Sequence, residues 1–284
     1  MQYIQHSDAL KFVESLPENS VDLVLTDPPY YGIVKDSWDN QWNSVEDFVA
    51  WLFWIFTACR RVLKPTGSIV FFGGIGKSQQ RPLLRMIEAM DRRFVYQNWI
   101  TWGKKRAYGK KDDYLFTREE ILWYTMSESF TFNIPLLAEK RGYAGFNAKY
   151  PAKSEFKRVT NVWSDIPELF RPKRYCQKPE PLMARLIETH SNPSDTIIDP
   201  FAGYGSTGMV ALKLRRQFQG CEIIEADAVA ANQRCKEVIE GVDEGVDDES
   251  IQQLETNNTL DGCTQCEEVV QEVRASSEPE KSKT

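Results

Sequence analysis

The strongest constraint on the fold is the stretch "DTIIDPFAGYGSTGMVALKL" at residues 195–214. It begins with a short apolar run that predicts a strand, and from Ser206 onward its apolar residues have helical spacing. Between these parts, Gly203, Gly205 and Gly208 complete a G-x-G-x-x-G pattern. Glycines at the carboxyl end of a strand let a ligand approach the backbone, so the stretch predicts a βαβ unit that binds a nucleoside.

The segment that follows supports this interpretation. The run "QFQGCE" predicts the next strand and ends at Glu222, 19 residues after Gly203, about where an acidic side chain binds ribose hydroxyls. A nicotinamide-dependent oxidoreductase would fit the glycine pattern about as well. Two features count against it: no second nucleotide-binding half follows the unit, and the dinucleotide pattern does not require the Asp-Pro-Phe at residues 199–201.

Strands alternate with helices through most of the chain, which predicts an α/β fold with a mostly parallel sheet and helices on both faces. No internal repeat is present, and residues 126–178 show so little periodicity that we expect a largely irregular insertion. We expect strands at residues 21–26, 67–72, 94–102, 120–125, 195–199 and 217–223, and helices at residues 8–15, 45–63, 78–90, 179–190, 206–215 and 227–240.

A second informative segment, "LVLTDPPYYG", lies at residues 23–32. Its apolar start predicts a buried strand that ends at Asp27. Pro28 and Pro29 lack an N–H and cannot continue the strand, so they stiffen the backbone just beyond it. Taken alone, the segment is most simply a proline-rich turn, and only the rest of the chain favours a functional role.

Charge is unevenly distributed. The chain has a net charge of −6, but residues 241–284 hold 12 acidic and 3 basic residues, net −9, which leaves +3 for residues 1–240. We therefore predict one folded domain at residues 1–240. The polar, acidic composition of residues 241–284 predicts a disordered tail.

Basic residues concentrate in two segments of the folded part. Residues 103–118 contain six basic and two acidic residues, and residues 139–174 contain nine basic and four acidic residues with aromatic residues between them. Basic side chains neutralise phosphates and aromatic rings stack on bases. We therefore predict that residues 103–118 and 135–175 are nucleic-acid recognition loops.

Other classes of protein are disfavoured. No run of 18 apolar residues is present, and the densest, which starts at Phe48, is broken by Arg60 and Arg61, so we expect no membrane span. Without a signal segment, the expected location is cytoplasmic. The six cysteines are scattered, and "CTQC" has no second cysteine pair or nearby histidine, so we expect neither a disulfide framework nor a metal site.

The motifs together resemble the DNA amino-methyltransferases, which transfer a methyl group from S-adenosylmethionine to an exocyclic amine. Their order, with the catalytic motif first and the cofactor motif last, is similar to that of the β group, so the resemblance implies a Rossmann-like methyltransferase sheet with permuted motif order. It covers nearly all of residues 1–240. In two places the chain departs from the pattern: Tyr175 and Cys176 precede Gln177 where His-Pro is often found, and Tyr204 stands where Ser is common. The motifs are "DPPY" (residues 27–30), "QKP" (177–179), "DPFAGYG" (199–205) and "GCEI" (220–223).

The resemblance implies a role for each matching residue. In the catalytic motif, the Asp27 carboxylate and the Pro28 carbonyl accept hydrogen bonds from the substrate amine, Pro29 fixes their direction, and Tyr30 stacks on the base. Asp8 matches a position near the cofactor adenine, although a helix N-cap is an equally good interpretation. The implied cofactor-binding residues are Asp8, Gln177, Lys178, Asp199, Phe201, Gly203, Gly205, Thr207 and Glu222.

The implied activity is sequence-specific methylation of adenine N6 in double-stranded DNA, with base flipping, in the context of restriction-modification. Within the family, Asp-Pro-Pro-Tyr usually accompanies adenine N6, and Ser in place of Asp usually accompanies cytosine N4. Single-stranded DNA as substrate and a homodimer are compatible with the resemblance. Four alternatives stay open: cytosine-N4 methylation, the same chemistry on RNA or protein, a nucleotide-binding oxidoreductase, and a nucleic-acid-binding module without catalytic activity.

Overall fold

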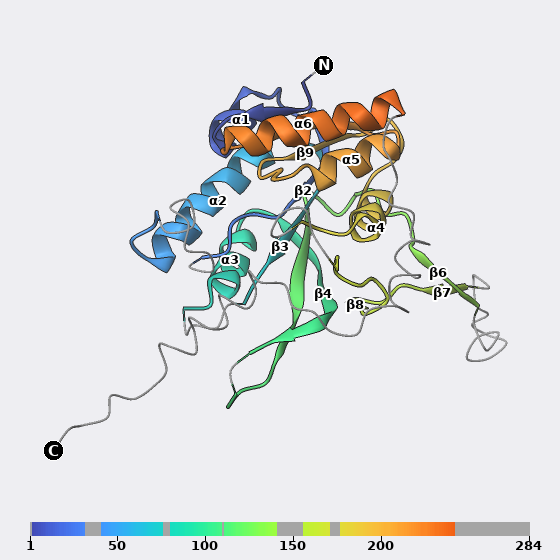
Figure 1. Ribbon diagram of the computed structural model, residues 1–284. Helices are drawn as coiled ribbons and strands as arrows, with labels where there is room; N and C mark the ends of the chain where they lie inside the picture. Colours follow the sequence, from blue (N-terminus) through green and yellow to red (C-terminus); the bar gives the residue numbers. More distant parts are fainter. Residues whose placement is uncertain are drawn as a thin grey trace. The chain divides into compact units, whose positions relative to one another are not determined.

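The computed structural model describes residues 2–31, 41–75, 80–109, 111–140, 156–170 and 177–241. These residues belong to one compact unit, Met1–Val242, built around an eight-stranded sheet with the order β1-β10-β9-β2-β3-β5-β4-β8 (Figure 1). A separate two-stranded sheet contains β6 (Leu136–Lys140) and β7 (Phe156–Arg158). The strands of the main sheet are β1 (Ile4–His6), β2 (Val21–Thr26), β3 (Leu63–Gly73), β4 (Val95–Tyr108), β5 (Phe116–Thr125), β8 (Val162–Trp163), β9 (Thr196–Asp199) and β10 (Gln217–Glu222).

The direction of the strands brings the sequence motifs to one edge of the sheet. β1, β10, β9, β2 and β3 run parallel to one another, which confirms the mostly parallel sheet that the sequence predicts. β5 runs antiparallel to both β3 and β4. The carboxyl ends of the five parallel strands therefore share an edge with the beginning of β5.

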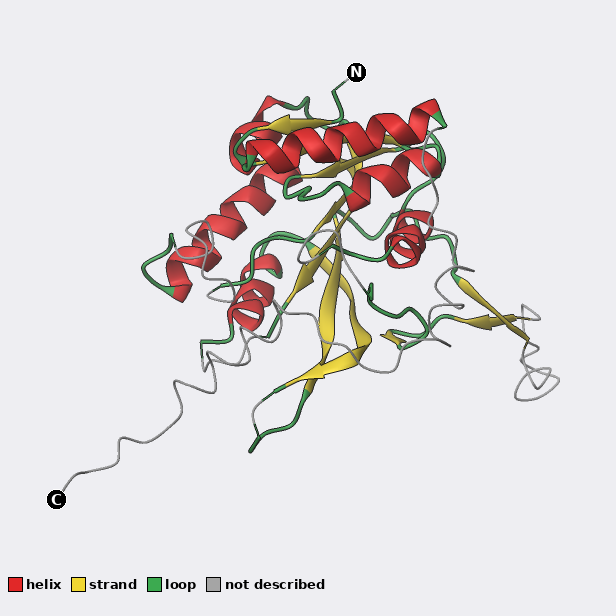
Figure 2. Cartoon of the chain, in the orientation of Figure 1, coloured by secondary structure: helices red, strands yellow, loops and turns green. Residues whose placement is uncertain are grey.

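Helices cover both faces of the sheet (Figure 2). Successive residues of a strand point to opposite faces. Leu23 and Leu25 of β2 belong to the core cluster that contains buried residues of α4, α5 and α6, whereas Val24 belongs to the cluster that contains those of α1, α2 and α3. Both sides of the central strands are thus buried, which explains their continuous apolar sequences. The helices are α1 (Ala9–Ser15), α2 (Val45–Val62), α3 (Pro82–Met90), α4 (Glu180–His190), α5 (Ser206–Lys213) and α6 (Glu225–Glu240).

All six expected strands and all six expected helices are present, with shifts at their ends. The expectation of a largely irregular segment at 126–178 is wrong for part of it, because β6, β7 and β8 lie there. These strands have five, three and two residues, which is too short to give a detectable period. Of the predicted loops and tail, residues 110, 141–155, 171–175 and 242–284 lie outside the described residues. Within the part of the chain that the structure describes, no helix is long and apolar enough to span a bilayer.

His190, the last residue of α4, makes folding stability depend on pH. Its side chain is buried against the rings of Trp123 and Phe132, at centroid distances of 4.6 and 5.9 Å. Burial lowers its pKa to about 3. The unfolded chain, in which histidine has a pKa of about 6.5, therefore binds the proton more tightly. As the pH is lowered from about 6.5 to 3, the free energy of unfolding falls by about 1.4 kcal/mol per pH unit.

We expect the free energy of unfolding to fall between pH 6.5 and 5 by about 2 kcal/mol more in the native sequence than in His190→Phe. Denaturant titrations at the two pH values measure this difference. His6, the second of the two histidines, is exposed, so His6→Gln is the matched control and should keep the full dependence. An equal dependence in His190→Phe would show that other groups cause it.

Candidate active site

Asp27 follows β2 directly, at the edge where the parallel strands end. One of its carboxylate oxygens, Oδ1, accepts a hydrogen bond from the Tyr30 hydroxyl at 2.7 Å, and the other, Oδ2, lies 2.5 Å from the Lys178 ammonium. Burial raises the pKa of Asp27, and the nearby ammonium opposes that rise. The structure thus presents a carboxylate that is largely removed from water and is charge-balanced by one cation.

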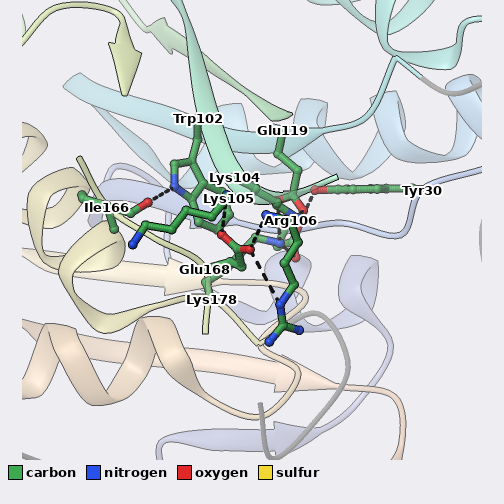
Figure 3. Close-up of polar contacts among 10 residues, drawn as sticks. Tyr30, Trp102, Lys104, Lys105, Arg106, Glu119, Ile166, Glu168 and Lys178 are labelled. Atoms are coloured by element: carbon green, nitrogen blue, oxygen red, sulfur yellow. Dashed lines mark hydrogen bonds and ion pairs between the residues drawn. The ribbon is translucent and has the colours of Figure 1, made fainter. Parts of the chain in front are cut away.

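Lys178 also connects Asp27 to a second carboxylate, that of Glu119. Lys104, Glu119 and Lys178 are labelled in Figure 3. Its ammonium lies 3.2 Å from Glu119 Oε2, and Glu119 Oε1 accepts a hydrogen bond from the Lys104 ammonium. Burial raises the pKa of Glu119, but the two ammonium groups outweigh this effect and the pKa lies below its ordinary value. We call this alternating series, Lys104–Glu119–Lys178–Asp27, the charge row.

The structure adds two findings about the charge row. The resemblance groups Lys178 with the cofactor residues, and in the structure its ammonium lies between the carboxylates of Asp27 and Glu119, 4.8 Å from the centre of the Phe72 ring. Sequence reasoning missed Glu119 altogether. Glu120 pairs with Gly73, the last residue of β3, so the start of the antiparallel β5 lies beside the catalytic motif. Only the direction of β5 reveals this proximity.

The glycine loop between β9 and α5 lies at the same edge. Gly203 and Gly205 have φ values of +50° and +82°, which favour glycine. A Cβ at Gly203 would meet nothing within 4 Å, so its backbone is open to a ligand. Glu222 Oε2 accepts a hydrogen bond from the Gly203 N–H at 3.0 Å, and Oε1 accepts one from the Ile224 N–H at 2.9 Å. The open backbone beside a carboxylate fits a nucleoside whose ribose hydroxyls donate to Glu222.

Asp199, the last residue of β9, holds this loop in place through hydrogen bonds. Its buried carboxylate accepts hydrogen bonds from the hydroxyls of Thr26 and Thr207, at 2.5 and 2.6 Å, and from the Phe201 N–H at 3.0 Å. Burial raises its pKa to about 6. Phe201 packs against Trp51 of α2, with ring centroids 5.7 Å apart. Asp199 and Thr207 therefore shape the loop, and Phe201 gives it an aromatic side.

The remaining candidate residues have the following places. Asp8 caps α1 and accepts a hydrogen bond from the Lys11 N–H at 3.1 Å, which confirms the N-cap interpretation. Gln177 is half-buried and immediately precedes Lys178. The Tyr204 ring lies 4.3 Å from the Arg234 guanidinium of α6, and its carbonyl oxygen accepts a hydrogen bond from the same group. These contacts explain how the loop accommodates the large side chain at position 204.

An apolar pocket adjoins the catalytic motif and is lined in part by Pro28, Pro29, Tyr30, Phe72 and Gly73. Its volume of about 20 Å³ is room for about one water molecule.

The predicted recognition loop at residues 103–118 is the outer part of a β4–β5 hairpin that extends beyond the helices (Figure 1). The backbone N–H groups of Lys105 and Arg106 donate to the Glu168 carboxylate at 2.9 and 2.7 Å, so the hairpin base is fixed to the segment after β8. Tyr114, near the hairpin tip, is 93% exposed. The hairpin carries basic and aromatic side chains, and its base is held by the Glu168 carboxylate.

Known proteins are similar to this chain in sequence. A family model described as DNA methylase, N6/N4 type, matches residues 21–233. The type II methyltransferase M.HpaI of Haemophilus parainfluenzae is 32% identical, over 84% of this chain and 75% of its own length. The DNA adenine methyltransferase YhdJ of Escherichia coli (strain K12) is 33% identical, over 78% of each chain.

Solved structures share the fold. The PvuII DNA methyltransferase (cytosine-N4-specific) superposes with a TM-score of 0.64 at 20% identity, over 88% of this chain and 89% of that one. TTHA0409 of Thermus thermophilus, solved in complex with S-adenosylmethionine, superposes with a TM-score of 0.60 at 24% identity, over 85% of this chain and 96% of that one. The Rossmann-like fold is confirmed, and with three quarters of its length matched by the family model, this chain belongs to the N6/N4 DNA methylase family.

Proposed function

We propose that this protein is a DNA methyltransferase that transfers the methyl group of S-adenosylmethionine to the N6 amine of adenine in a specific sequence. The observation that carries the proposal is the ion-paired Asp27, whose side chain is 21% exposed, followed by two prolines and Tyr30, at the same sheet edge as the open Gly203 backbone and Glu222. The adenine assignment is supported by the Asp-Pro-Pro-Tyr sequence and by the name of the E. coli relative.

The proposed chemistry needs two hydrogen-bond acceptors. The lone pair of an exocyclic amine is delocalised into the base, so the nitrogen is a poor nucleophile until it turns towards tetrahedral geometry. S-adenosylmethionine supplies an electrophilic methyl group on a sulfonium. Asp27 and the Pro28 carbonyl accept from the two N–H bonds and aim the lone pair, which is catalysis by preorganised electrostatics. In this role Asp27 orients the amine, and after methyl transfer the methylated nitrogen gives up its extra proton to water.

The target base must leave the duplex before this geometry can form. Flipping costs a few kcal/mol, and stacking on an aromatic ring returns about 1–3 kcal/mol. In the proposed complex the base lies against the Tyr30 ring while its amine reaches the Asp27 carboxylate. Lys105 and Lys111 of the hairpin are exposed and add contacts to DNA phosphates.

For the cofactor, we propose that Glu222 binds the ribose, that Phe201, Gly203 and Gly205 line the methionine part, and that Asp8 lies near the adenine. Gln177 is the candidate contact from the segment before α4. Asp199 and Thr207 keep the loop in its binding conformation through the hydrogen bonds already described. In this proposal residues 1–240 form the catalytic domain and residues 241–284 an appended acidic tail.

The proposal is tested by incubating the protein with methyl-labelled S-adenosylmethionine and unmethylated plasmid DNA, followed by nucleoside analysis by mass spectrometry. The expected product is N6-methyladenine. N4-methylcytosine would replace the adenine assignment, and label found only in parallel RNA or protein samples would exclude DNA as the substrate. Single-molecule sequencing of the product DNA then gives the recognition sequence.

A further inference from the structure

The charge row reaches the catalytic residue from three parts of the chain. Lys104 belongs to β4, Glu119 to β5, and Lys178 to the segment that precedes α4. Within the row the signs alternate, and each inner member contacts a partner of opposite charge on both sides. The Lys178 side chain is 7% exposed and that of Glu119 is 15% exposed, so both interactions act in a medium of low dielectric.

The two Asp27 oxygens have different surroundings. Oδ2 is held by the Lys178 ammonium, whereas Oδ1 accepts from the hydroxyl of Tyr30, a neutral group three residues along the chain. A substrate amine can share or replace a neutral donor far more easily than a buried ammonium. The geometry therefore assigns Oδ1 as the oxygen that receives the amine.

We propose that Lys178 and Glu119 are positioning residues for methyl transfer: Lys178 holds Asp27 ionised with Oδ1 directed at the substrate amine, and Glu119 holds Lys178 in place. This inference rests on the proposed function, because it assigns roles at the same site. It also links the base of the DNA-recognition hairpin, through Lys104 and Glu119, to the catalytic carboxylate.

The neighbours of Asp27 act on its charge in opposite directions. Lys178 and the Tyr30 hydroxyl favour the ionised form, whereas Glu119 disfavours it by like-charge repulsion. Asp199, from β9, is a further buried carboxylate that interacts electrostatically with Asp27. Removing the Lys178 ammonium should therefore raise the pH at which Asp27 ionises, and removing the Glu119 carboxylate should lower it. A general loss of structure would not give these opposite shifts.

The test is the pH dependence of kcat/KM for methylation of unmethylated plasmid DNA. In this profile the acidic limb reports the ionisation of an essential base in the free enzyme. We expect Lys178→Met to shift the acidic limb by about 1–3 pH units to higher pH, so that activity lost at neutral pH returns in more alkaline buffer. Lys178→Arg keeps a cation and should leave the limb near its original position.

Glu119→Gln should shift the acidic limb to lower pH, by up to about one pH unit. It should also lower kcat several-fold, because the Lys178 ammonium loses one of the two carboxylates that hold it. The matched control is Lys64→Met. Lys64 pairs with Asp22 at 2.8 Å near the beginning of β2, away from the catalytic edge, so its profile should equal that of the native enzyme.

Unshifted acidic limbs in both Lys178→Met and Glu119→Gln would overturn the positioning roles. Were Lys178→Met not to fold, as judged by circular dichroism, Glu119→Gln would decide: an acidic limb moved to lower pH supports the proposal and an unchanged limb contradicts it. A native protein that methylates no DNA would contradict the proposed function instead, so the two failures are distinguishable.

Discussion

Substituting Asp27 by Ala is expected to lower the rate of methyl transfer to DNA by at least about 10³-fold. The change removes both carboxylate oxygens, and with them the proposed charged acceptor for the substrate amine. Loss of a single preorganised hydrogen-bonding group in an active site typically costs about 10²–10³-fold. Here the lost group is charged and largely buried, where its field is strongest. Initial rates with labelled S-adenosylmethionine and plasmid DNA measure the effect.

The substitution should leave the fold intact, because the Lys178 ammonium keeps Glu119 as a partner. Binding of S-adenosylmethionine to Asp27→Ala should therefore be close to native. Asp27→Asn, which keeps the shape but not the charge, should also be strongly impaired. Glu88, a 75% exposed carboxylate on α3, provides the control Glu88→Ala, with native activity expected. Full activity of Asp27→Ala would contradict the proposed mechanism.

The elements that carry the motifs could be predicted from the sequence because their signals are local. β2 and β9 are short, mainly apolar runs, each with an Asp and then a Pro at its end, and a strand cannot continue through these prolines. The glycine loop and α5 follow directly. Parallel strands place their carboxyl ends at one edge, and the order β10-β9-β2 in the structure brings Glu222, Asp199 and Asp27 to that edge.

The charge row could not be predicted, because its contacts are not local. Lys178 and Asp27 are 151 residues apart in the sequence. A short apolar run such as "ILWYT" in β5 has the same pattern whichever way the strand runs, so its period does not place Glu119 at the catalytic edge. The signal in the sequence was two consecutive glutamates just before the apolar run of β5, an arrangement that is equally typical of a solvated strand end.

Substituting Glu222 by Ala is expected to weaken the binding of S-adenosylmethionine by about 10²-fold. The carboxylate accepts hydrogen bonds from the N–H groups of Gly203 and Ile224, so its loss leaves two donors without their acceptor and frees the end of the glycine loop. It also removes the proposed acceptor for the ribose hydroxyls. Hydrogen bonds to charged groups contribute about 1.5–3 kcal/mol each. Loss of the two proposed bonds from the ribose hydroxyls to Glu222 therefore accounts for a weakening of about 10²-fold. Isothermal titration calorimetry measures the Kd directly.

The Glu222 and Asp27 substitutions should separate binding from chemistry. Glu222→Ala is expected to raise KM for S-adenosylmethionine while much of kcat returns at saturating cofactor, whereas Asp27→Ala should lower kcat with little change in cofactor affinity. Glu225, exposed on the first turn of α6, is the matched control, and Glu225→Ala should bind S-adenosylmethionine normally. A native Kd in Glu222→Ala would place the ribose elsewhere. A loss of kcat that saturating cofactor does not restore would show that the glycine loop also helps to position the methyl group against the Asp27 edge.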